Sequence, residues 1–459
     1  MKKIFLNIYI IINVFIKIFS SEKLLKIPFK LFHTSHFYQE NPDILSNKYM
    51  SQLIIELSIG KPSQKLNVSL DLNDNFYSYF LGNNLPNINF SILYNKSLSN
   101  TYKCEKEKEL FTIELFNKAE IFSDNVIFSS DDKNIEKNLK FLLINDLYKS
   151  IYTPGLIGLA LKRDDRQLEE NSFLYQLEKN NLISSEVFYF NFENDKSGKL
   201  IIGENIFNNE NYLKIKVGYI SSLSSKLLWS FNYDSIYYGD SKNIGTGDGI
   251  IELGHGLIIG TSTYEELIKS FFMKEKNCFL NYTNIGNLNL KYFWCEKEND
   301  IENKIENLNF ELKSINYNFS LNGKDLFFQE NDKKFFKILF LFDLNLKYWY
   351  LGLDFLQKFN IRFDHERKLL YIPLKENIDN NEENKNNKIA NDDFALLNLV
   401  KKWQFWLCFF LTIFIIGLII YVIIYIKKYP KKKPVYELDD TDEYYDYKIK
   451  ENLSDNNIN

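Results

Sequence analysis

Two stretches of this chain share one layout, in which an apolar run leads into a single acidic residue at a turn. The stretch KLNVSLDLND alternates apolar residues and reaches Asp71, and GDGIIELGHG reaches Glu252. Each is followed downstream by a second apolar stretch with a close-packed glycine, Gly158 in PGLIGLA and Gly352 in WYLGLDFL. Two carboxylates at equivalent places in two similar halves predict a bilobal protein with a cleft between the halves.

The body of the chain reads as mainly β. Runs such as SQLIIELSI, QKLNVSLDL, FTIELF, VFYFNF, GKLIIG and LWSFNYDSIYYG are short, rich in β-branched and aromatic residues, and bounded by turn residues. The clearest helical stretches, NSFLYQLEKNNL and STYEELIKSFF, each have a Ser or Thr at the start that can cap a helix. With 459 residues, 45% of them hydrophobic, the chain is long enough to bury a sizeable core.

The N-terminus is typical of a secretory signal peptide, predicted over 1–21. Lys2 and Lys3 precede an apolar stretch, 4–19, and the small residues Ser20 and Ser21 follow it. A short uncleaved anchor is the alternative interpretation. Either way, the sequence directs the body of the chain into the secretory pathway.

Near the other end, 403–426 contains no charged residue and, at about 1.5 Å per residue, is long enough to cross a bilayer as a helix. Five lysines follow this span closely and only two precede it, so the positive-inside rule places the tail, 427–459, in the cytoplasm. The polar segment 375–402 is predicted to be a stalk. We therefore expect a single-pass type I membrane protein in the secretory pathway or at the cell surface, with its body luminal or extracellular.

Charge and cysteine usage narrow the function classes further. Lys and Arg number 56 against 60 Asp and Glu, so no basic excess points to nucleic acid. No residue set suggests a metal or another cofactor. Cys278 and Cys295 bracket one loop in a compartment that permits disulfides, and we predict that they are bonded. Cys408 lies in the predicted span, and Cys104 has no evident partner.

At this point the sequence, over about 24–373, resembles the pepsin-like aspartic proteases, including membrane-anchored members of the plasmepsin type. LLKIPFKLF is similar to the pro-segment strand of that family, and YMSQLIIELSIGKPSQKLNVSLDLNDN to its opening strands and first active-site loop. GIIELGHGLIIGTSTYEEL resembles the second active-site loop with its helix, and WYLGLDFLQKFNIRFDHERKLLYIP the closing strands. The resemblance implies a pro-segment-like strand within 22–48, an N-terminal lobe at 49–210 and a C-terminal lobe at 211–374. It also places a disulfide where Cys278 and Cys295 stand.

The resemblance implies that Asp71 and Glu252 occupy the catalytic positions, but both motifs depart from the Asp-Thr/Ser-Gly pattern of the family. Asp71 is followed by Leu and Asn, and Glu252 by Leu and Gly, so both hydroxyls and one glycine are missing. In the flap, Ile113 stands where the family has a tyrosine, and Glu114 where it has a glycine.

These departures matter because the family's chemistry uses two carboxylates about 3 Å apart that share one proton and hold one water. Displacing a catalytic group by about 1 Å can cost on the order of a hundredfold in rate, and Glu252 is one methylene longer than Asp. As an alternative to catalysis, Asp71 and Glu252 are solvated turn residues or bind backbone amides. His255 is interpreted as a polar turn residue rather than a metal ligand, and Asp74 as a loop residue rather than a substitute acid.

Three functions stay open at this point. The first is a catalytically impaired pseudoprotease that binds a polypeptide in its interlobe cleft. The second is an active endopeptidase that works through Asp71 and Glu252. The third is a structural or adhesive ectodomain whose cleft is filled by side chains. The motif losses favour the first, and the retention of two acids favours the second.

Overall fold

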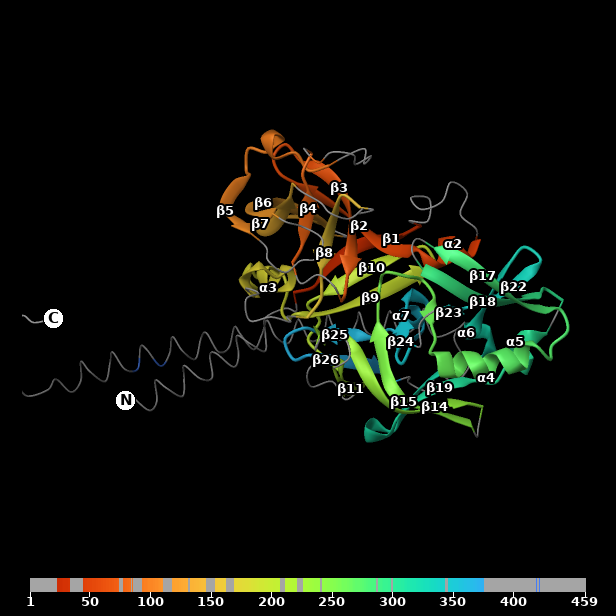
Figure 1. Cartoon of the computed structure of the whole chain (residues 1–459). Coiled ribbons are helices and arrows are strands. Elements are labelled where there is room, and N and C mark those ends of the chain that lie inside the picture. The colour runs from red at the N-terminus through yellow and green to blue at the C-terminus, as the bar shows by residue number, and fades with distance from the viewer. Residues whose placement is uncertain are drawn as a thin grey trace, which may run out of the picture. The chain divides into compact units, whose positions relative to one another are not determined.

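Figure 1 shows the chain as a computed structural model. The structure describes residues 23–33, 44–73, 77–83, 85, 93–109, 118–130, 133–145, 153–161, 169–206, 211–220, 226–239, 242–285, 288–298, 300–342, 346–374, 418 and 421. All but the last two belong to one compact unit that ends at Leu374. Leu418 and Tyr421 belong to a second unit, Lys375–Asn459.

The first of two large sheets combines strands from both halves of the compact unit, thirteen of them among the described residues. In spatial order they are β11 (Tyr212–Lys216), β26 (Leu369–Pro373), β25 (Arg362–Asp364), β9 (Val187–Asn194), β10 (Ser197–Ile202), β1 (Leu25–His33), β2 (Ser51–Ile59), β3 (Gln64–Asp71), β8 (Gly155–Gly158), β4 (Tyr79–Leu81), β7 (Lys133–Ile144), β6 (Lys118–Ser130) and β5 (Lys103–Glu109). The part from β3 to β5 belongs to the N-terminal half alone.

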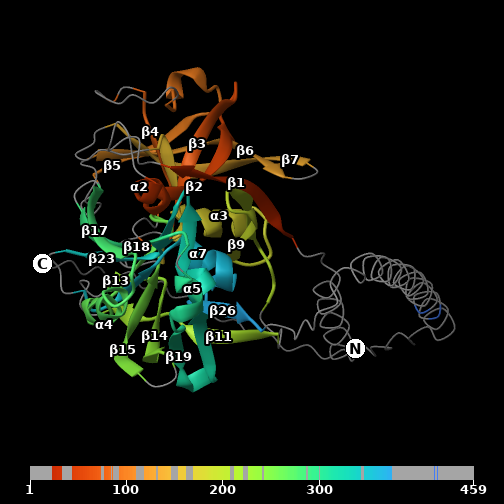
Figure 2. The same cartoon turned by 90° about the vertical axis from the view of Figure 1, so that its right-hand side faces the viewer.

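The second large sheet is built from the C-terminal half alone. In spatial order its strands are β20 (Tyr317–Leu321), β19 (Leu308–Leu312), β14 (Ser230–Tyr238), β15 (Lys242–Ile251), β24 (Trp349–Leu351), β16 (Ile258–Ile259), β23 (Ile338–Leu341), β18 (Leu288–Glu296), β22 (Lys333–Phe336) and β21 (Phe327–Glu330), with β17 (Cys278–Ile285) paired to β18. A small sheet pairs β12 (Tyr219–Ile220) with β13 (Lys226–Leu227). Figure 2 shows the two halves as separate groups of strands, red to yellow above and green to blue below. The predicted bilobal, mainly β fold is confirmed.

Helices are few and short among the described residues. The α-helices are α2 (Ile44–Tyr49), α3 (Phe173–Lys179), α4 (Ser262–Phe272), α5 (Ile301–Lys304), α6 (Gly323–Leu326) and α7 (Leu353–Phe359), and the 3₁₀ turns are η2 (Lys96–Leu98), η3 (Glu169–Asn171) and η4 (Lys313–Ile315). Both predicted helices, α3 and α4, are present. Ser172 stands at the N-cap of α3 but its side chain makes no capping hydrogen bond, and Ser262, with which the second stretch begins, is the first residue inside α4, so both predicted caps are wrong.

The strand pairing confirms the internal duplication that the sequence predicts. In the first half, β3 is parallel to β8, β8 antiparallel to β4, and β4 parallel to β7. In the second half, β15 is parallel to β24, β24 antiparallel to β16, and β16 parallel to β23. The two glycine-containing stretches of the sequence form β8 and β24. The acidic residues Asp71 and Glu252 come at the ends of the two equivalent strands β3 and β15.

The central part of the first sheet joins the two halves. β1 lies between β2 and β10 and pairs antiparallel with both. β9 pairs on one side with β10 and on the other with β25, a strand from the far end of the folded chain. The predicted pro-segment-like strand is thus an integral member of the sheet in this structure. The domain boundaries drawn from the sequence stay predictions.

The predicted disulfide is present. Cys278 and Cys295 face each other across the β17–β18 pair and are bonded, with their Cα atoms 4.0 Å apart. Cys104, on β5, is a free and exposed thiol. The bond therefore closes a hairpin at the surface of the C-terminal half.

Several predicted features lie outside the described residues. These are the signal peptide 1–21, the stalk 375–402, the tail 427–459 and, except for Leu418 and Tyr421, the span 403–426 with Cys408. Among the helices that the structure does describe, none has the length and apolar character that crossing a membrane requires.

Candidate functional site

Asp71 is positioned by the parallel pairing of β3 with β8. It is the last residue of β3 and lies in register with Gly158. Its backbone carbonyl accepts a hydrogen bond from the Leu159 N–H at 2.7 Å. Its side-chain Oδ1 accepts one from the Asn73 N–H at 2.8 Å, a local turn contact typical of Asp. The strand and the turn together fix the direction in which the carboxylate points.

Glu252 is held in the equivalent way by β15 and β24. Its backbone N–H donates to the Leu351 carbonyl at 3.0 Å, and the Ile251 N–H before it donates to the Trp229 carbonyl at 2.8 Å. The Glu252 side chain is 27% exposed. Its carboxylate is therefore held at a fixed strand end and still reaches solvent.

Asn73 joins the two loops. Its side-chain Nδ2 donates to the Ile251 carbonyl at 2.5 Å, and its Oδ1 accepts from the Trp229 N–H at 3.0 Å. The residue is only 5% exposed, so both bonds are shielded from water. Because Asn73 is two residues after Asp71 and Ile251 directly precedes Glu252, this amide brings the two acid-bearing loops together.

Asn73 is the residue whose role the sequence reading missed. Its only signal was an amide in the first turn, next to a position where the expected hydroxyl is absent. The two positions of those hydroxyls are taken by Leu72 and Leu253, which are both buried in the main hydrophobic core. Apolar packing of Leu72 and Leu253 and the side-chain amide of Asn73 thus stabilise the two loops, in which both hydroxyls are missing.

His255 is buried beside Glu252, with 4% of its surface exposed. Its Nδ1 lies 2.6 Å from the Leu257 carbonyl oxygen, and its Nε2 lies 3.2 Å from Glu252 Oε2. The Nε2 contact lacks hydrogen-bond alignment, so it acts through charge rather than direction. The Tyr49 ring stacks on the imidazole at a centroid distance of 5.4 Å. His255 is therefore a turn residue, as predicted, but one enclosed by its neighbours.

The contacts of His255 fix where protons can be. A carbonyl oxygen can only accept, so Nδ1 carries the ring proton of a neutral imidazole. Nε2 then presents a lone pair to Glu252, and an ionised carboxylate would be repelled by it. The contact is attractive only if His255 and Glu252 hold one further proton between them, either as a charged ring or as a protonated carboxyl. Glu252 thus has a close polar neighbour in its own loop.

Each acid also has a buried tyrosine near it. Burial raises the pKa of Tyr79 above its ordinary range, and the negative charge of Asp71 adds to the shift. Burial raises the pKa of Tyr49 in the same way, and the charge of Glu252 adds to it. The two phenols therefore stay neutral around the candidate site.

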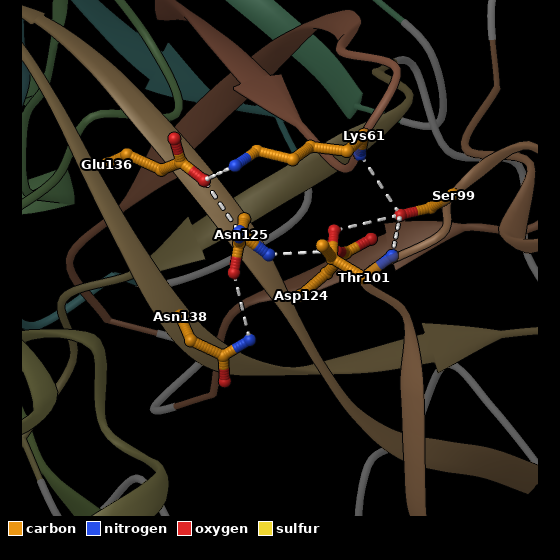
Figure 3. A network of polar contacts seen from close by, with 7 residues as sticks. All are labelled: Lys61, Ser99, Thr101, Asp124, Asn125, Glu136 and Asn138. Atoms are coloured by element: carbon orange, nitrogen blue, oxygen red, sulfur yellow. Dashed lines mark hydrogen bonds and ion pairs between the residues drawn. The ribbon is translucent and has the colours of Figure 1, made fainter.

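A polar network supports the base of the hairpin that β5 and β6 form in the first half (Figure 3). Its centre is Asp124, which is fully buried and accepts from the hydroxyls of Tyr94 at 2.6 Å and Thr101 at 2.5 Å. Ser99 connects Thr101 to the Lys61 backbone N–H. The predicted flap residue Ile113, its neighbour Glu114, and Asp74 lie outside the described residues.

Two further observations limit the chemistry. Within the described ranges no group of three or more His, Cys, Asp or Glu side chains could hold a metal ion. A pocket of about 310 Å³ lies away from the two acids and is lined by Leu45, Tyr292, Trp294, Glu330, Asn331, Asp332, Lys333 and Phe335. The candidate site is therefore the meeting point of the two loops.

Comparison with known proteins agrees with this geometry. A family model described as eukaryotic aspartyl protease matches residues 52–372, which is most of the chain. A search of curated proteins gives no significant match. The matched range contains both acids, Asn73, His255 and the disulfide.

Proposed function

Because this chain belongs to the eukaryotic aspartyl protease family, we propose that it is a membrane-anchored member that binds polypeptide in its interlobe cleft and has lost efficient hydrolysis. The anchor is the segment 403–426, and the body is luminal or extracellular. The ligand class follows from the family, whose members act on polypeptides.

The contact between His255 and Glu252 carries this proposal. Hydrolysis by this family needs two carboxylates that share one proton and hold a water between them. Here Nε2 of His255 lies 3.2 Å from Glu252 Oε2 without hydrogen-bond alignment, so the Glu252 carboxylate has a close polar neighbour other than Asp71. That competing partner, together with the longer Glu side chain, opposes the shared-proton state with Asp71.

The loop contacts of Asn73 support a retained binding role. The amide keeps both loops in register although both hydroxyls are gone. A scaffold that needed only to fill space would have no need of this alignment. We therefore favour a cleft that still binds over the purely structural ectodomain.

An active endopeptidase is the second candidate, and one observation favours it. Asp71 and Glu252 both remain acids, at the ends of equivalent strands that Asn73 links. In that case Asp71 would be the general base and Glu252 the general acid. His255 would return a proton to Glu252 after each cycle.

The deciding experiment uses the full-length chain purified in detergent, beside its Asp71→Ala and Glu252→Ala variants. A mixed peptide library is incubated with each from acidic to neutral pH, and both hydrolysis and photo-cross-linking to the chain are measured. We expect cross-linking without hydrolysis. Circular dichroism of each variant controls for folding.

Hydrolysis that disappears in both variants would overturn the pseudoprotease proposal and establish the endopeptidase. If a folded chain shows neither cross-linking nor hydrolysis, the structural ectodomain is the function that remains. A His255→Gln variant sharpens the result, because gain of hydrolysis on removal of the ring would identify His255 as the cause of the impairment.

A further inference from the structure

A second buried histidine contact lies behind the first loop. Nδ1 of His365 is 2.7 Å from Glu186 Oε2, and the two residues are 9% and 7% exposed. The backbones are tied as well, because the His365 N–H donates to the Glu186 carbonyl at 3.2 Å. Glu186 directly precedes β9 and His365 directly follows β25, so the pair sits at the central sheet that joins the two halves.

The other ring nitrogen faces the N-terminal half. Nε2 of His365 lies 3.3 Å from the carbonyl oxygen of Ala160. A carbonyl and a carboxylate are both acceptors, and a neutral imidazole has only one N–H to offer. Both contacts are hydrogen bonds at once only when His365 and Glu186 together hold two protons, either as a doubly protonated ring beside a carboxylate or as a ring protonated at Nε2 beside a protonated carboxyl.

The segment that His365 contacts is directly connected to the candidate site. Ala160 follows Leu159, whose N–H donates to the Asp71 carbonyl at 2.7 Å. The carbonyl of Leu159 accepts from Trp229 Nε1 at 2.9 Å, and the Trp229 backbone N–H donates to Asn73. His365 and Trp229 are thus two side-chain donors that hold the chain directly behind Asp71.

Several described charged residues lie beside His365 in sequence or interact with Glu186. Besides Glu186 they are Asp364, Glu366 and Arg367 beside it in sequence and Glu178 on α3; the described stretch 153–161 brings none. Burial raises the pKa of the Glu178 carboxyl, and repulsion by Glu186 and Glu366 adds to this. Burial also raises the pKa of Asp364.

We propose that His365 is a positioning residue that fixes the Leu159 and Ala160 backbone behind Asp71 while its ring is doubly protonated. When the ring loses a proton, one of the two contacts becomes a meeting of two acceptors and is lost. The sign follows: the contribution is present at the acidic pH at which the second proton is bound, and it disappears when rising pH removes that proton. The inference does not depend on whether the cleft binds or cuts.

Hydrogen exchange of the Leu159 amide tests this, since that N–H is the one bonded to Asp71. Exchange is measured by mass spectrometry on the full-length chain at about pH 5 and about pH 8, and corrected for the intrinsic pH dependence. We expect protection to fall about tenfold at the higher pH, which is the scale of losing one charge-assisted hydrogen bond.

Three variants distinguish this from a merely structural role. His365→Arg keeps a permanent charge and two donors, so protection should stay high at both pH values. His365→Gln should be low at both. His255→Gln, a change at the other buried histidine, should leave the pH dependence intact. Protection independent of pH in the unmodified chain, or pH dependence that persists in His365→Arg, would overturn the proposal even if His365→Gln does not fold.

Discussion

The two acid-bearing loops have the same strand support and different side-chain contacts. Each acid ends a strand that is parallel to its neighbour and is tied to it by one backbone hydrogen bond, 2.7 Å at Asp71 and 3.0 Å at Glu252. In the first loop the polar contacts run across to the other half through Asn73. In the second loop the Glu252 side chain contacts His255 of the same half, and the Tyr49 ring from the N-terminal part of the chain stacks on that imidazole.

This difference shows that two duplicated halves can keep the same strand order while the side-chain contacts of their loops become different. The strand order repeats in full, because it is specified by apolar patterning that many residues share. The polar contacts depend on single side chains, and these have become unlike. As a result the first loop reaches the other half through its Asn73 side chain, and the second places an imidazole beside its own acid.

The largest expected effect comes from Asn73→Ala, which removes the connection. It leaves the buried Ile251 carbonyl and Trp229 N–H without partners, so we expect unfolding free energy to fall by about 3 kcal/mol. Urea denaturation followed by tryptophan fluorescence measures this. Asn73→Asp is the matched control, since it keeps the acceptor for Trp229 and loses only the donor. A loss below about 1 kcal/mol for Asn73→Ala would show that the loops do not depend on this amide.

A somewhat smaller effect is expected in the second loop. His255→Ala removes a buried ring and its contact with the Leu257 carbonyl, which should cost about 2 kcal/mol. Glu252→Gln should cost less than about 1 kcal/mol, because an amide N–H can still face the lone pair of Nε2. Thermal and urea unfolding compare the two. Equal losses of unfolding free energy in His255→Ala and Glu252→Gln would mean that the charge of Glu252 stabilises the loop.

The two buried tyrosines predict an alkaline limit that both loops share. The raised pKa values of Tyr49 and Tyr79 keep the phenols protonated in the folded state, while the unfolded chain loses these protons above about pH 10. Stability is therefore present below that pH and falls above it. Tyr49→Phe and Tyr79→Phe should each reduce the fall by up to about 1.4 kcal/mol per pH unit, measured by urea unfolding between pH 9 and 11. The exposed Tyr282→Phe is the control, and equal slopes in all three variants would contradict the prediction.

The smallest effect is expected at Gly254, the glycine that the second motif retains. A Cβ there would meet nothing within 4 Å, so Gly254→Ala should change stability by less than about 0.5 kcal/mol. At Gly352, in contrast, a Cβ would clash with backbone carbonyls of Leu257 and His255, and Gly352→Ala should destabilise strongly. Thermal melts of both test this. A strong loss of stability in Gly254→Ala would indicate that the second loop is closely packed around this residue.

The features that were predictable from sequence are those set by repeated local signals. Alternating apolar residues identified β3, an apolar run ahead of Glu252 identified the end of β15, and two cysteines across a loop identified the disulfide. The role of Asn73 was not predictable, because it depends on where the backbone of another loop, about 180 residues away, presents a carbonyl. The burial of His255 was missed for a similar reason, since Tyr49 covers the ring from a distant part of the chain. Capping was predicted at Ser172 and Ser262 from residue type alone, but the Ser172 side chain makes no capping hydrogen bond and Ser262 lies inside α4.

The pairing of β9 with β25 has a consequence for how the chain is made. β9 is complete once residue 194 has been synthesised, but its partner strand begins at Arg362. During translation β9 therefore presents an open edge while well over a hundred further residues are added, and contacts of such long sequence separation form slowly. A ribosome that stalls before residue 362 would release a chain with that edge unpaired, which is a site for aggregation. The last few strands thus complete both halves of the protein at once.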